Sequence, residues 1–486
     1  MIGAEFHGRE HYRPEPGYRL LPFRFTRFDD RLLVVNDVGE HVFLSQGEFD
    51  EFVGKRLKTT SNAYLDLKGK HFLFDSDARA PFALLATKYR TKKSTLADFT
   101  VLHIFVITLR CEHFCGYCQV SRVSADRARF DMSEETAARA LDLAFRSPSP
   151  RLKIEFQGGE PLLNFERLRR IVLEAEKRGS GSGKEIEFVV TTNLALVTDE
   201  MLDFFRDHRV SVSTSLDGPE EIHNANRPRP GGDSHARTIA GVERVRAALG
   251  HDAVAALMTT TRRSLQSPEA IVDEYVRQGF SSIFIRALSP FGFARKSAGR
   301  IGYSIDDFLG FYVRALNRIL EINRTGRRLV ETYAQILLAR MLTPFDTGYV
   351  DLRSPAGAGI GAIVYNYDGD VYASDESRML AEMGDRRFRL GNVHRDSFDE
   401  VFGSAALRRI VFDSVIESWP GCADCAFQPW CGADPVLNYA MQGDLTGHRP
   451  TSEFHRKHDF LFRHLLQLYE NDDEARRIFS RWVAEA

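Results

Sequence analysis

Between about residue 100 and residue 290, short runs with strand character alternate with longer stretches in which apolar residues recur at helical spacing. This order predicts repeated strand–helix units, which build a parallel sheet. The expected strands are residues 102–108, 152–156, 186–191, 210–215, 254–260 and 283–288. Six units are two short of a closed eight-stranded barrel. The expected fold is therefore α/β, with a partial, TIM-like (βα)6 barrel.

The first hundred residues carry a different pattern. Residues 32–36 and 40–44 alternate apolar and polar side chains on either side of a short turn, which predicts a β-hairpin. Ser45 and Glu48 have the spacing of a capping box at the start of an amphipathic helix. With a third apolar run at residues 71–74, this pattern predicts a small α+β unit.

The pattern also predicts three domains. We interpret the polar stretch 89–94 as a solvated connector, so the N-terminal domain is expected to span residues 1–98 and the barrel residues 99–342. Residues 343–486 form the third predicted domain. It begins with a hairpin-like segment over residues 363–372 and ends in a helix.

Composition places the chain among ordinary folded proteins, since its 486 residues are 43% hydrophobic and 27% charged. Its 65 lysines and arginines nearly balance 67 aspartates and glutamates, for a net charge of −2, so we expect no electrostatic capture of nucleic acid. No run approaches the roughly 20 apolar residues of a membrane helix, and the start lacks the basic and apolar regions of a secretion signal. We expect a soluble, cytoplasmic protein that binds no membrane.

The cysteines are clustered. The six fall into two triplets, Cys111, Cys115 and Cys118, and then Cys422, Cys425 and Cys431. Six in a chain of this length are too few for a disulfide scaffold, and clustering in a reducing compartment favours metal or iron–sulfur ligation.

The first triplet has the spacing C-x3-C-x2-C and directly follows the first expected barrel strand. It should lie on a loop at the C-terminal end of that strand, where such folds place their chemistry. Three thiolates can hold three irons of a cubane cluster and leave the fourth iron open for a substrate or cofactor. The alternative is a structural zinc site, to which His113 could contribute a ligand.

The triplet, with Tyr117 before its third cysteine, resembles the signature of the radical S-adenosylmethionine (SAM) enzymes. Supporting motifs follow in the order expected for that family. Gln157 to Pro161, reading QGGEP, is similar to the family's GGE motif, and Ser213 to Gly218, reading STSLDG, ends the fourth expected strand. The resemblance implies that Glu160 receives the SAM amino group and Arg227 its carboxylate. It implies a SAM site made of Tyr117, Gly158, Gly159, Glu160, Asn193, Ser215, Asp217 and Arg227.

The resemblance also implies an activity. The first triplet would bind a [4Fe–4S] cluster with an open iron site for SAM, which is cleaved to methionine and a 5′-deoxyadenosyl radical that removes hydrogen from an unactivated C–H bond. The chain would then be a radical SAM oxidoreductase whose own residues position the substrate and exclude water and oxygen. An electron donor such as flavodoxin or ferredoxin is an expected partner.

The second triplet, C-x2-C-x5-C, resembles the auxiliary iron–sulfur domain called SPASM, or its shorter twitch form, found in radical SAM enzymes that modify peptides. Ser354 and Ser374 stand where that family has two hairpin cysteines, which argues against a cluster that depends on the hairpin. His455 is the preferred fourth ligand of a second auxiliary cluster, with Asp434 as the other candidate. A structural zinc ion, or no metal, remains open.

Segments such as Leu390 to Val393 and Cys431 to Pro435 look like the radical SAM peptide maturase of the His-Xaa-Ser system, and the resemblance covers nearly the whole chain. It implies a ribosomally made precursor peptide (RiPP) as substrate and a second radical SAM enzyme as companion. The N-terminal domain is similar to winged-helix-like recognition elements, which bind the leader of such a peptide as an added strand. The alternative is a cap that only packs on the barrel.

Three functions compete. The first is maturation of a precursor peptide by a side-chain cross-link or another modification, with Asp375, Glu376 and Asp434 as candidate proton acceptors. The second is maturation of a folded enzyme, as in sulfatase-activating relatives, although those usually keep the hairpin cysteines. The third is a non-catalytic iron–sulfur or peptide-carrier protein, against which the intact cysteines and GGE motif argue.

Overall fold

The computed structural model describes residues 17–75, 80–118 and 126–485. Two compact units emerge, one of residues 1–94, 340–346 and 420–430, and a larger one of residues 95–339, 347–419 and 431–486. The three expected domains, residues 1–98, 99–342 and 343–486, stay a prediction. Residues 1–16, for which no secretion signal was expected, lie outside the described part of the chain.

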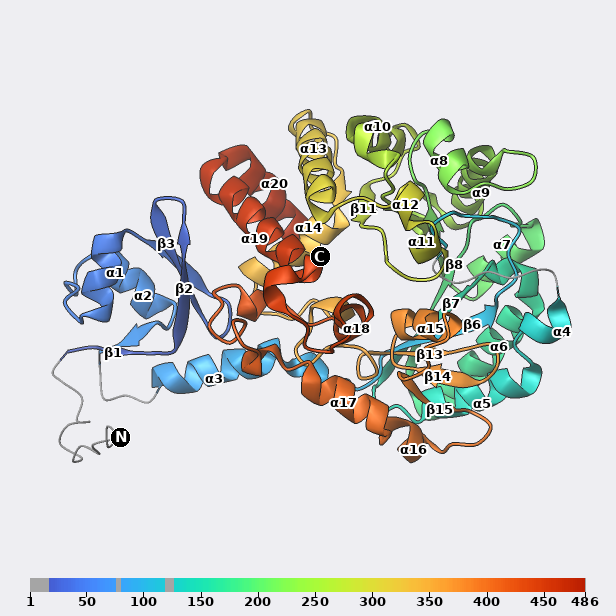
Figure 1. The fold of residues 1–486 in the computed structure, drawn as a ribbon, viewed down its shortest axis with the longest axis horizontal. Coiled ribbons are helices and arrows are strands. Elements are labelled where there is room, and N and C mark those ends of the chain that lie inside the picture. Colours follow the sequence, from blue (N-terminus) through green and yellow to red (C-terminus); the bar gives the residue numbers. More distant parts are fainter. Residues whose placement is uncertain (1–16, 76–79, 119–125, 486) are drawn as a thin grey trace. The chain divides into compact units, whose positions relative to one another are not determined.

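The larger unit contains the expected partial barrel, so this α/β fold class is confirmed. Six strands lie side by side in parallel, each on an expected run: β6 (Leu102–Thr108), β7 (Arg151–Gly158), β8 (Glu185–Thr191), β9 (Val210–Ser215), β10 (Val254–Thr259) and β11 (Ser282–Arg286). Figure 1 shows helices around the outside of these strands. The helices of this part of the chain are α4 (Arg127–Phe130), α5 (Glu134–Phe145), α6 (Phe165–Ser182), α7 (Asp199–Asp207), α8 (Glu220–Asn226), α9 (Ser234–Leu249), α10 (Pro268–Arg277), α11 (Phe293–Lys296), α12 (Ala298–Ile301) and α13 (Ile305–Arg324).

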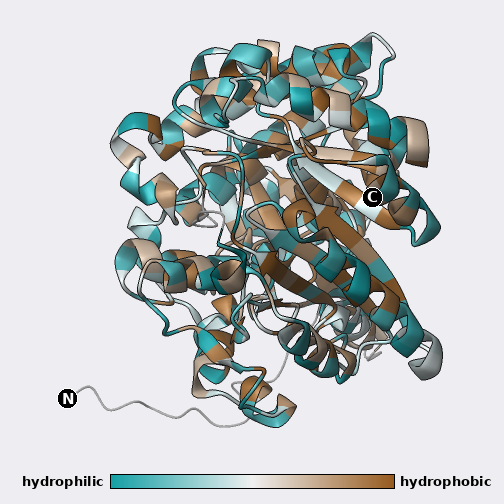
Figure 2. Cartoon of the chain, turned by 90° about the vertical axis from the view of Figure 1, so that its right-hand side faces the viewer, coloured by the Kyte–Doolittle hydropathy of each residue, from teal (hydrophilic) through white to brown (hydrophobic). Residues whose placement is uncertain are grey.

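Alternation along the strands separates the two faces of the sheet. On β7, Leu152, Ile154 and Phe156 are fully buried, whereas the intervening Lys153, Glu155 and Gln157 keep part of their surface exposed on the other face. In Figure 2 the strands of this sheet are largely brown, and the helices carry both teal and brown residues. The apolar face packs under helices, which leaves polar side chains on the inner face of the barrel.

The sheet continues past the barrel at both edges. β12 (Val330–Glu331) pairs with β11, and β13 (Ala362–Tyr365) runs parallel to β6. β13, β14 (Asp370–Tyr372) and β15 (Arg389–Asn392) then form an antiparallel extension that includes the expected hairpin. The remaining helices are α14 (Thr332–Leu342), α15 (Asp375–Glu382), α16 (Phe398–Phe402), α17 (Ala405–Asp413), α18 (Pro435–Gln442), α19 (Glu453–Asn471) and α20 (Asp473–Ala484).

The smaller unit is the expected α+β unit. Its elements are β1 (Arg19–Leu20), β2 (Phe23–Phe28), β3 (Arg31–Asn36), β4 (His41–Leu44), α1 (Gln46–Val53), α2 (Asn62–Gly69), β5 (Leu73–Phe74) and α3 (Ala80–Lys92). β3 and β4 are the expected hairpin, and Ser45 and Glu48 form the expected capping box of α1. Sequence reasoning missed β2, which makes the sheet three-stranded in the order β2-β3-β4.

The stretch 89–94 is exposed or half-buried, as expected of a solvated connector, but Lys92 within it is not. Its first residues are the last turn of α3, and Lys92 is only 6% exposed. The Lys92 ammonium donates to the carbonyl oxygens of Val38 at 3.0 Å and Arg340 at 3.3 Å. Burial lowers the pKa of Lys92 to about 7. At Lys92 the prediction was wrong because a lysine can bury its apolar stem when carbonyl groups receive its ammonium.

Within the described residues, no helix combines the length and the apolar character needed to cross a membrane.

Candidate active site

The first cysteine triplet lies in the loop that leaves the C-terminal end of β6. Two backbone hydrogen bonds anchor this loop to the end of α8 and the segment that follows it: Phe114 N donates to the Pro228 oxygen at 2.6 Å, and Gly116 N to the Asn226 oxygen at 3.2 Å. The three thiols are half-buried. Burial raises the pKa of the Cys111 thiol and raises that of Cys115 to about 11. Without a metal both groups stay protonated at neutral pH, and a bound iron ion would supply the positive charge that favours thiolates.

The GGE motif packs against the strand that leads into this loop. A Cβ atom on Gly158 would lie 2.2 Å from the carbonyl oxygen of Thr108, and one on Gly159 would lie 2.2 Å from that of Arg110. These distances leave no room for a side chain. The two glycines therefore allow the ends of β6 and β7 to pack closely, and this packing fixes the position of Cys111.

Glu160 is completely buried and already holds three donors. Its Oε1 accepts from Leu162 N at 2.9 Å and Thr192 Oγ1 at 2.7 Å, and its Oε2 accepts from Asn193 N at 2.9 Å. A carboxylate offers about four lone-pair sites, so room remains for about one further donor such as an ammonium group. Burial, followed by the charge of Glu112, raises the pKa of Glu160 to about 7.

Three other predicted SAM-binding residues form one hydrogen-bonded group. The Tyr117 hydroxyl donates to Asp217 Oδ2 at 2.7 Å, and Arg227 Nη1 donates to the Tyr117 oxygen at 2.7 Å. Arg227 Nε is buried and meets no acceptor among the described residues. A buried donor without an acceptor is unfavourable, and a carboxylate such as that of SAM would satisfy it. Ser215 is half-buried at the end of β9.

Residues that sequence reasoning did not assign to the SAM site connect the two halves of this site. Glu112 Oε1 accepts from Asn193 Nδ2 at 2.8 Å and lies 3.0 Å from His113 Nδ1. His113 Nε2 lies 2.9 Å from Ser234 Oγ, which lies 3.1 Å from His223 Nε2. Glu112 and His113 lie in the cysteine loop, His223 in α8 and Ser234 at the start of α9, so no sequence spacing links them and only the fold shows that they meet.

The same contacts bear on the zinc alternative. Cys111, Glu112 and His113 bring three ligand-type atoms within 4.8 Å of one another. Both ring nitrogens of His113 already have hydrogen-bonding partners, whereas a structural zinc site needs four committed ligands. The donor set fits three cysteine ligands and an open fourth position better than a closed zinc site.

The second triplet is divided between the two units. Cys422 and Cys425 belong to the smaller unit, where Cys425 N donates to the Cys422 oxygen at 3.1 Å, and Cys431 belongs to the larger one. In the larger unit, His455 lies in the first turn of α19, and its Nε2 accepts from Arg449 Nε at 3.3 Å. Ligation by this triplet and His455 stays a prediction.

The serines in the two hairpin positions have structural partners. Ser354 Oγ donates to the Glu417 carboxylate and accepts from Ile416 N at 3.1 Å. Ser374 caps α15 by accepting from Ser377 N at 3.2 Å. Both hydroxyl groups support local structure, and the absence of a cluster that depends on this hairpin stays a prediction.

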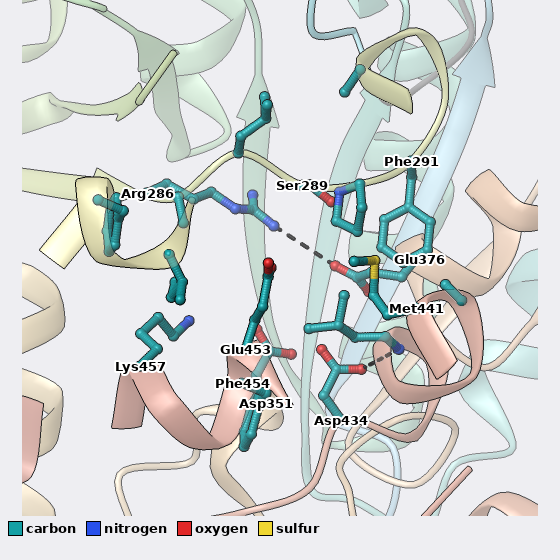
Figure 3. Close-up of a pocket in the computed structure, with 18 of the residues that line it drawn as sticks. Arg286, Ser289, Phe291, Asp351, Glu376, Asp434, Met441, Glu453, Phe454 and Lys457 are labelled. Carbon is teal, nitrogen blue, oxygen red and sulfur yellow. Dashed lines mark hydrogen bonds and ion pairs between the residues drawn. The ribbon is translucent and has the colours of Figure 1, made fainter. Parts of the chain in front are cut away.

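A cavity of about 480 Å³ opens beside the end of β11 (Figure 3). It adjoins a second cavity of about 250 Å³ that reaches Glu155 and Gln157 on the inner face of β7. The two cavities share five lining residues: Arg286, Tyr349, Asp351, Glu376 and Asp434. Clefts at the C-terminal ends of barrel strands are the usual substrate sites of such folds.

The three predicted proton acceptors all line this space. Glu376 Oε1 lies 3.7 Å from Arg286 Nη2, Asp434 Oδ1 accepts from Leu437 N at 2.9 Å, and Asp375 pairs with a buried arginine of its own helix. Burial, then the charges of Asp351 and Asp434, raises the pKa of Glu376 to about 8. Burial, then Asp351, raises that of Asp434 to about 7. Carboxyl groups with pKa values near 7 are suited to exchange protons at neutral pH.

Sequence reasoning missed the other charged residues of the cavity, among them Arg286, Asp351 and Lys457. Arg286 ends β11, Asp351 lies in the helical turn Val350–Leu352, and Lys457 belongs to α19. They come from distant parts of the chain and form no motif, so the sequence held no signal for them.

Comparisons with known proteins agree with this geometry. The model of the radical SAM superfamily matches residues 105–283. The cysteine-type anaerobic sulfatase-maturating enzyme of Clostridium perfringens is 26% identical over 308 residues, which are 60% of this chain and 77% of that enzyme.

Two solved structures share the fold. Native anSMEcpe with bound AdoMet and the Cp18Cys peptide has a TM-score of 0.62 and 18% identity, and covers 79% of this chain and 99% of that one. Streptococcus suis SuiB bound to the precursor peptide SuiA has a TM-score of 0.51 and 14% identity, and covers 88% and 98%. The later cysteines are consistent with a SPASM-like region. Residues 105–283, with the cysteine loop and the GGE motif among them, therefore form a radical SAM domain.

Proposed function

We propose that this chain is a radical SAM maturase that modifies a ribosomally made precursor peptide, with a cross-link between side chains as the product. The observation that carries the proposal is the common location of three features. The cysteine loop, the GGE motif and the cavity all lie where strands of one barrel end. A cavity of about 480 Å³ has room for side chains of an extended peptide.

The residues suit defined tasks. Cys111, Cys115 and Cys118 would hold the cluster, and Glu160 and Arg227 would orient SAM through its amino and carboxylate groups. When bound, these groups supply a 5′-deoxyadenosyl radical that takes one hydrogen atom from the substrate. A cross-link needs a second hydrogen to leave as a proton and an electron. Glu376 is placed to accept the proton, and a second cluster or an external acceptor would take the electron.

The smaller unit supports a role in peptide binding. β2 and β4 are the edge strands of its three-stranded sheet, and an edge strand can pair with an extended peptide. We assign the leader segment of the precursor to this unit. A flavodoxin or ferredoxin as electron donor, a companion radical SAM enzyme and a cytoplasmic location complete the proposal.

Maturation of a folded enzyme is the second candidate. It is favoured by the sulfatase-maturating relative from Clostridium perfringens. The structural use of Ser354 and Ser374 counts against it, since those enzymes usually keep cysteines at these positions.

The test has two stages. Anaerobically reconstituted protein should cleave SAM in the presence of dithionite and release 5′-deoxyadenosine, and Cys115→Ala should not. Co-expression with a candidate precursor peptide encoded next to the gene of this chain should then yield a peptide lighter by two hydrogens. Absence of 5′-deoxyadenosine would favour a carrier protein, and modification of a sulfatase instead of the peptide would favour the second candidate.

A further inference from the structure

The cavity differs from an ordinary peptide pocket in its charge. Six carboxylates line its two parts, Glu155, Asp351, Asp375, Glu376, Asp434 and Glu453. Three cationic side chains line it, Arg286, Arg295 and Lys457. We propose that the cavity selects a basic side chain of the substrate, so that a lysine, arginine or protonated histidine of the peptide enters it. The inference rests on the proposed function for the identity of the substrate as a peptide.

The cavity's own cations offset the six carboxylates only in part, although the charge of Lys457 acts on both Asp351 and Asp434. Arg286 is the partner of Glu376 at 3.7 Å, and Asp375 pairs with Arg378 outside the cavity at 3.2 Å. Asp351 and Asp434 form no ion pair within 4.0 Å in the part of the chain that the structure describes, and Glu453 is exposed. The charge of Lys457 does not outweigh burial and the charge of Asp351, which together raise the pKa of Asp434 to about 7. An enclosed carboxylate without a counter-charge is unfavourable and is relieved by a proton or by a cation. A basic ligand supplies that cation.

The spacing of the carboxylates favours an organic cation over a metal ion. Oxygen ligands lie about 2.0–2.6 Å from Mg²⁺ or Ca²⁺, so ligand oxygens around one ion lie within about 5 Å of one another. Among the described residues, the only trio of ligand-type atoms that close is the one at Cys111. The cavity carboxylates are spread more widely, as suits an ammonium, guanidinium or imidazolium group with several donors.

Aromatic rings form another part of the wall and accept positive charge. The rings of Tyr333 and Tyr349 lie 5.9 Å apart, and Lys457 Nζ lies 5.2 Å from the centre of the Tyr333 ring. This contact shows that the wall receives an ammonium group. In Figure 3, Arg286 and Lys457 lie on the left of the cavity, and Glu376 and Asp434 lie on the right. The side with Glu376 is therefore the one that faces a cationic ligand.

The test measures binding without turnover. Capped pentapeptides Gly-Gly-X-Gly-Gly, with lysine, norleucine or glutamate at X, are titrated into the SAM-loaded holoenzyme under anaerobic conditions without dithionite. We expect the lysine peptide to bind at least about tenfold more tightly than the norleucine peptide, a factor that corresponds to about 1.4 kcal/mol, and the glutamate peptide to bind most weakly.

Variants locate the effect. Glu376→Gln combined with Asp351→Asn should reduce the lysine preference to less than about threefold, because both changes remove charge and keep shape. Glu221→Gln is the matched control, since the Glu221 side chain is 90% exposed on α8, and it should leave the preference unchanged. Equal binding of the three peptides, binding of none at millimolar concentration, or a preference that survives the double variant would overturn the inference.

A second readout is independent of affinity. Because the pKa of Glu376 is about 8, this carboxyl is partly protonated at neutral pH, and a nearby ammonium group favours its ionised form. Binding of the lysine peptide should release protons, seen as a binding enthalpy that depends on the ionisation enthalpy of the buffer. Binding without proton release would contradict the proposed contact. If the reconstituted protein forms no 5′-deoxyadenosine, the proposed function is refuted, whereas the result of this binding experiment still stands.

Discussion

Gly159 provides the sharpest test of how the structure holds its cysteine loop. In Gly159→Ala, the new Cβ would lie 2.2 Å from the Arg110 oxygen, 2.5 Å from the Leu109 oxygen and 2.6 Å from the Arg110 carbonyl carbon. All three are backbone atoms, so no side chain can rotate away. The end of β6 must move, and Cys111 is the next residue along the chain.

Overpacking a well-packed site costs about 1–3 kcal/mol, and obstruction by backbone atoms places this change at or above the upper end of that range. Domains are stable by only about 5–15 kcal/mol, so a loss of about 3 kcal/mol is easily measured. The displaced loop should also retain less iron, because three thiolates must converge on one cluster.

The assay is urea denaturation of the metal-free protein, followed by iron and sulfide analysis after anaerobic reconstitution. Gly310→Ala is the matched control, since Gly310 lies within α13 and a Cβ there would meet nothing within 4 Å. This control should gain about 0.5–1 kcal/mol from the better helix former. If Gly159→Ala keeps both the unfolding midpoint and the iron content of the wild type, the argument for backbone contact is wrong.

Three further predictions concern single side chains. Arg227→Met should weaken SAM binding at least about tenfold at unchanged iron content, because the buried Nε donor would lose its carboxylate; equal affinity would contradict this role. Glu376→Gln should abolish formation of the peptide product while 5′-deoxyadenosine still forms. In the wild type, the rate of product formation should rise as the pH passes about 8, where Glu376 ionises. A rate that does not change with pH would show that another group accepts the proton. Lys92→Met should remove a pH dependence of stability. Burial lowers the pKa of Lys92 from 10.5 to about 7, so between pH 7 and 10 the unfolded chain binds more protons than the folded one. The wild-type free energy of unfolding should therefore rise over this range by up to about 1.4 kcal/mol per pH unit, and urea melts of the variant should lack this slope.

The barrel could be predicted because one physical rule governs each strand. On β7, Leu152, Ile154 and Phe156 face the core and alternate with more polar residues, so the strand can be recognised from the sequence. The cysteine loop could also be predicted, because its three candidate ligands, Cys111, Cys115 and Cys118, lie within one short segment of the sequence. The position of that loop at the end of β6 followed from the strand alone.

Other features depend on contacts between distant segments. Arg286, Asp351 and Lys457 meet in one cavity only after three separate elements have packed together. Lys92 was misread because its charge suggests solvent, whereas the fold supplies two carbonyl acceptors. The motif assigned Gly159 to the SAM-binding site. Only the structure shows that the backbone of Arg110 also leaves no room for a side chain at this position.

The parallel pairing of β13 with β6 has a consequence for engineering. β6 is hydrogen-bonded to β7 on one side and to β13 on the other, although β13 comes more than two hundred residues later in the chain. A chimera that keeps this chain only up to residue 342 would lack β13. β6 would then have an unpaired edge directly before the cysteine loop. Any transplantable catalytic module must therefore include β13, so new substrate-recognition segments are better grafted after the β13–β14 hairpin.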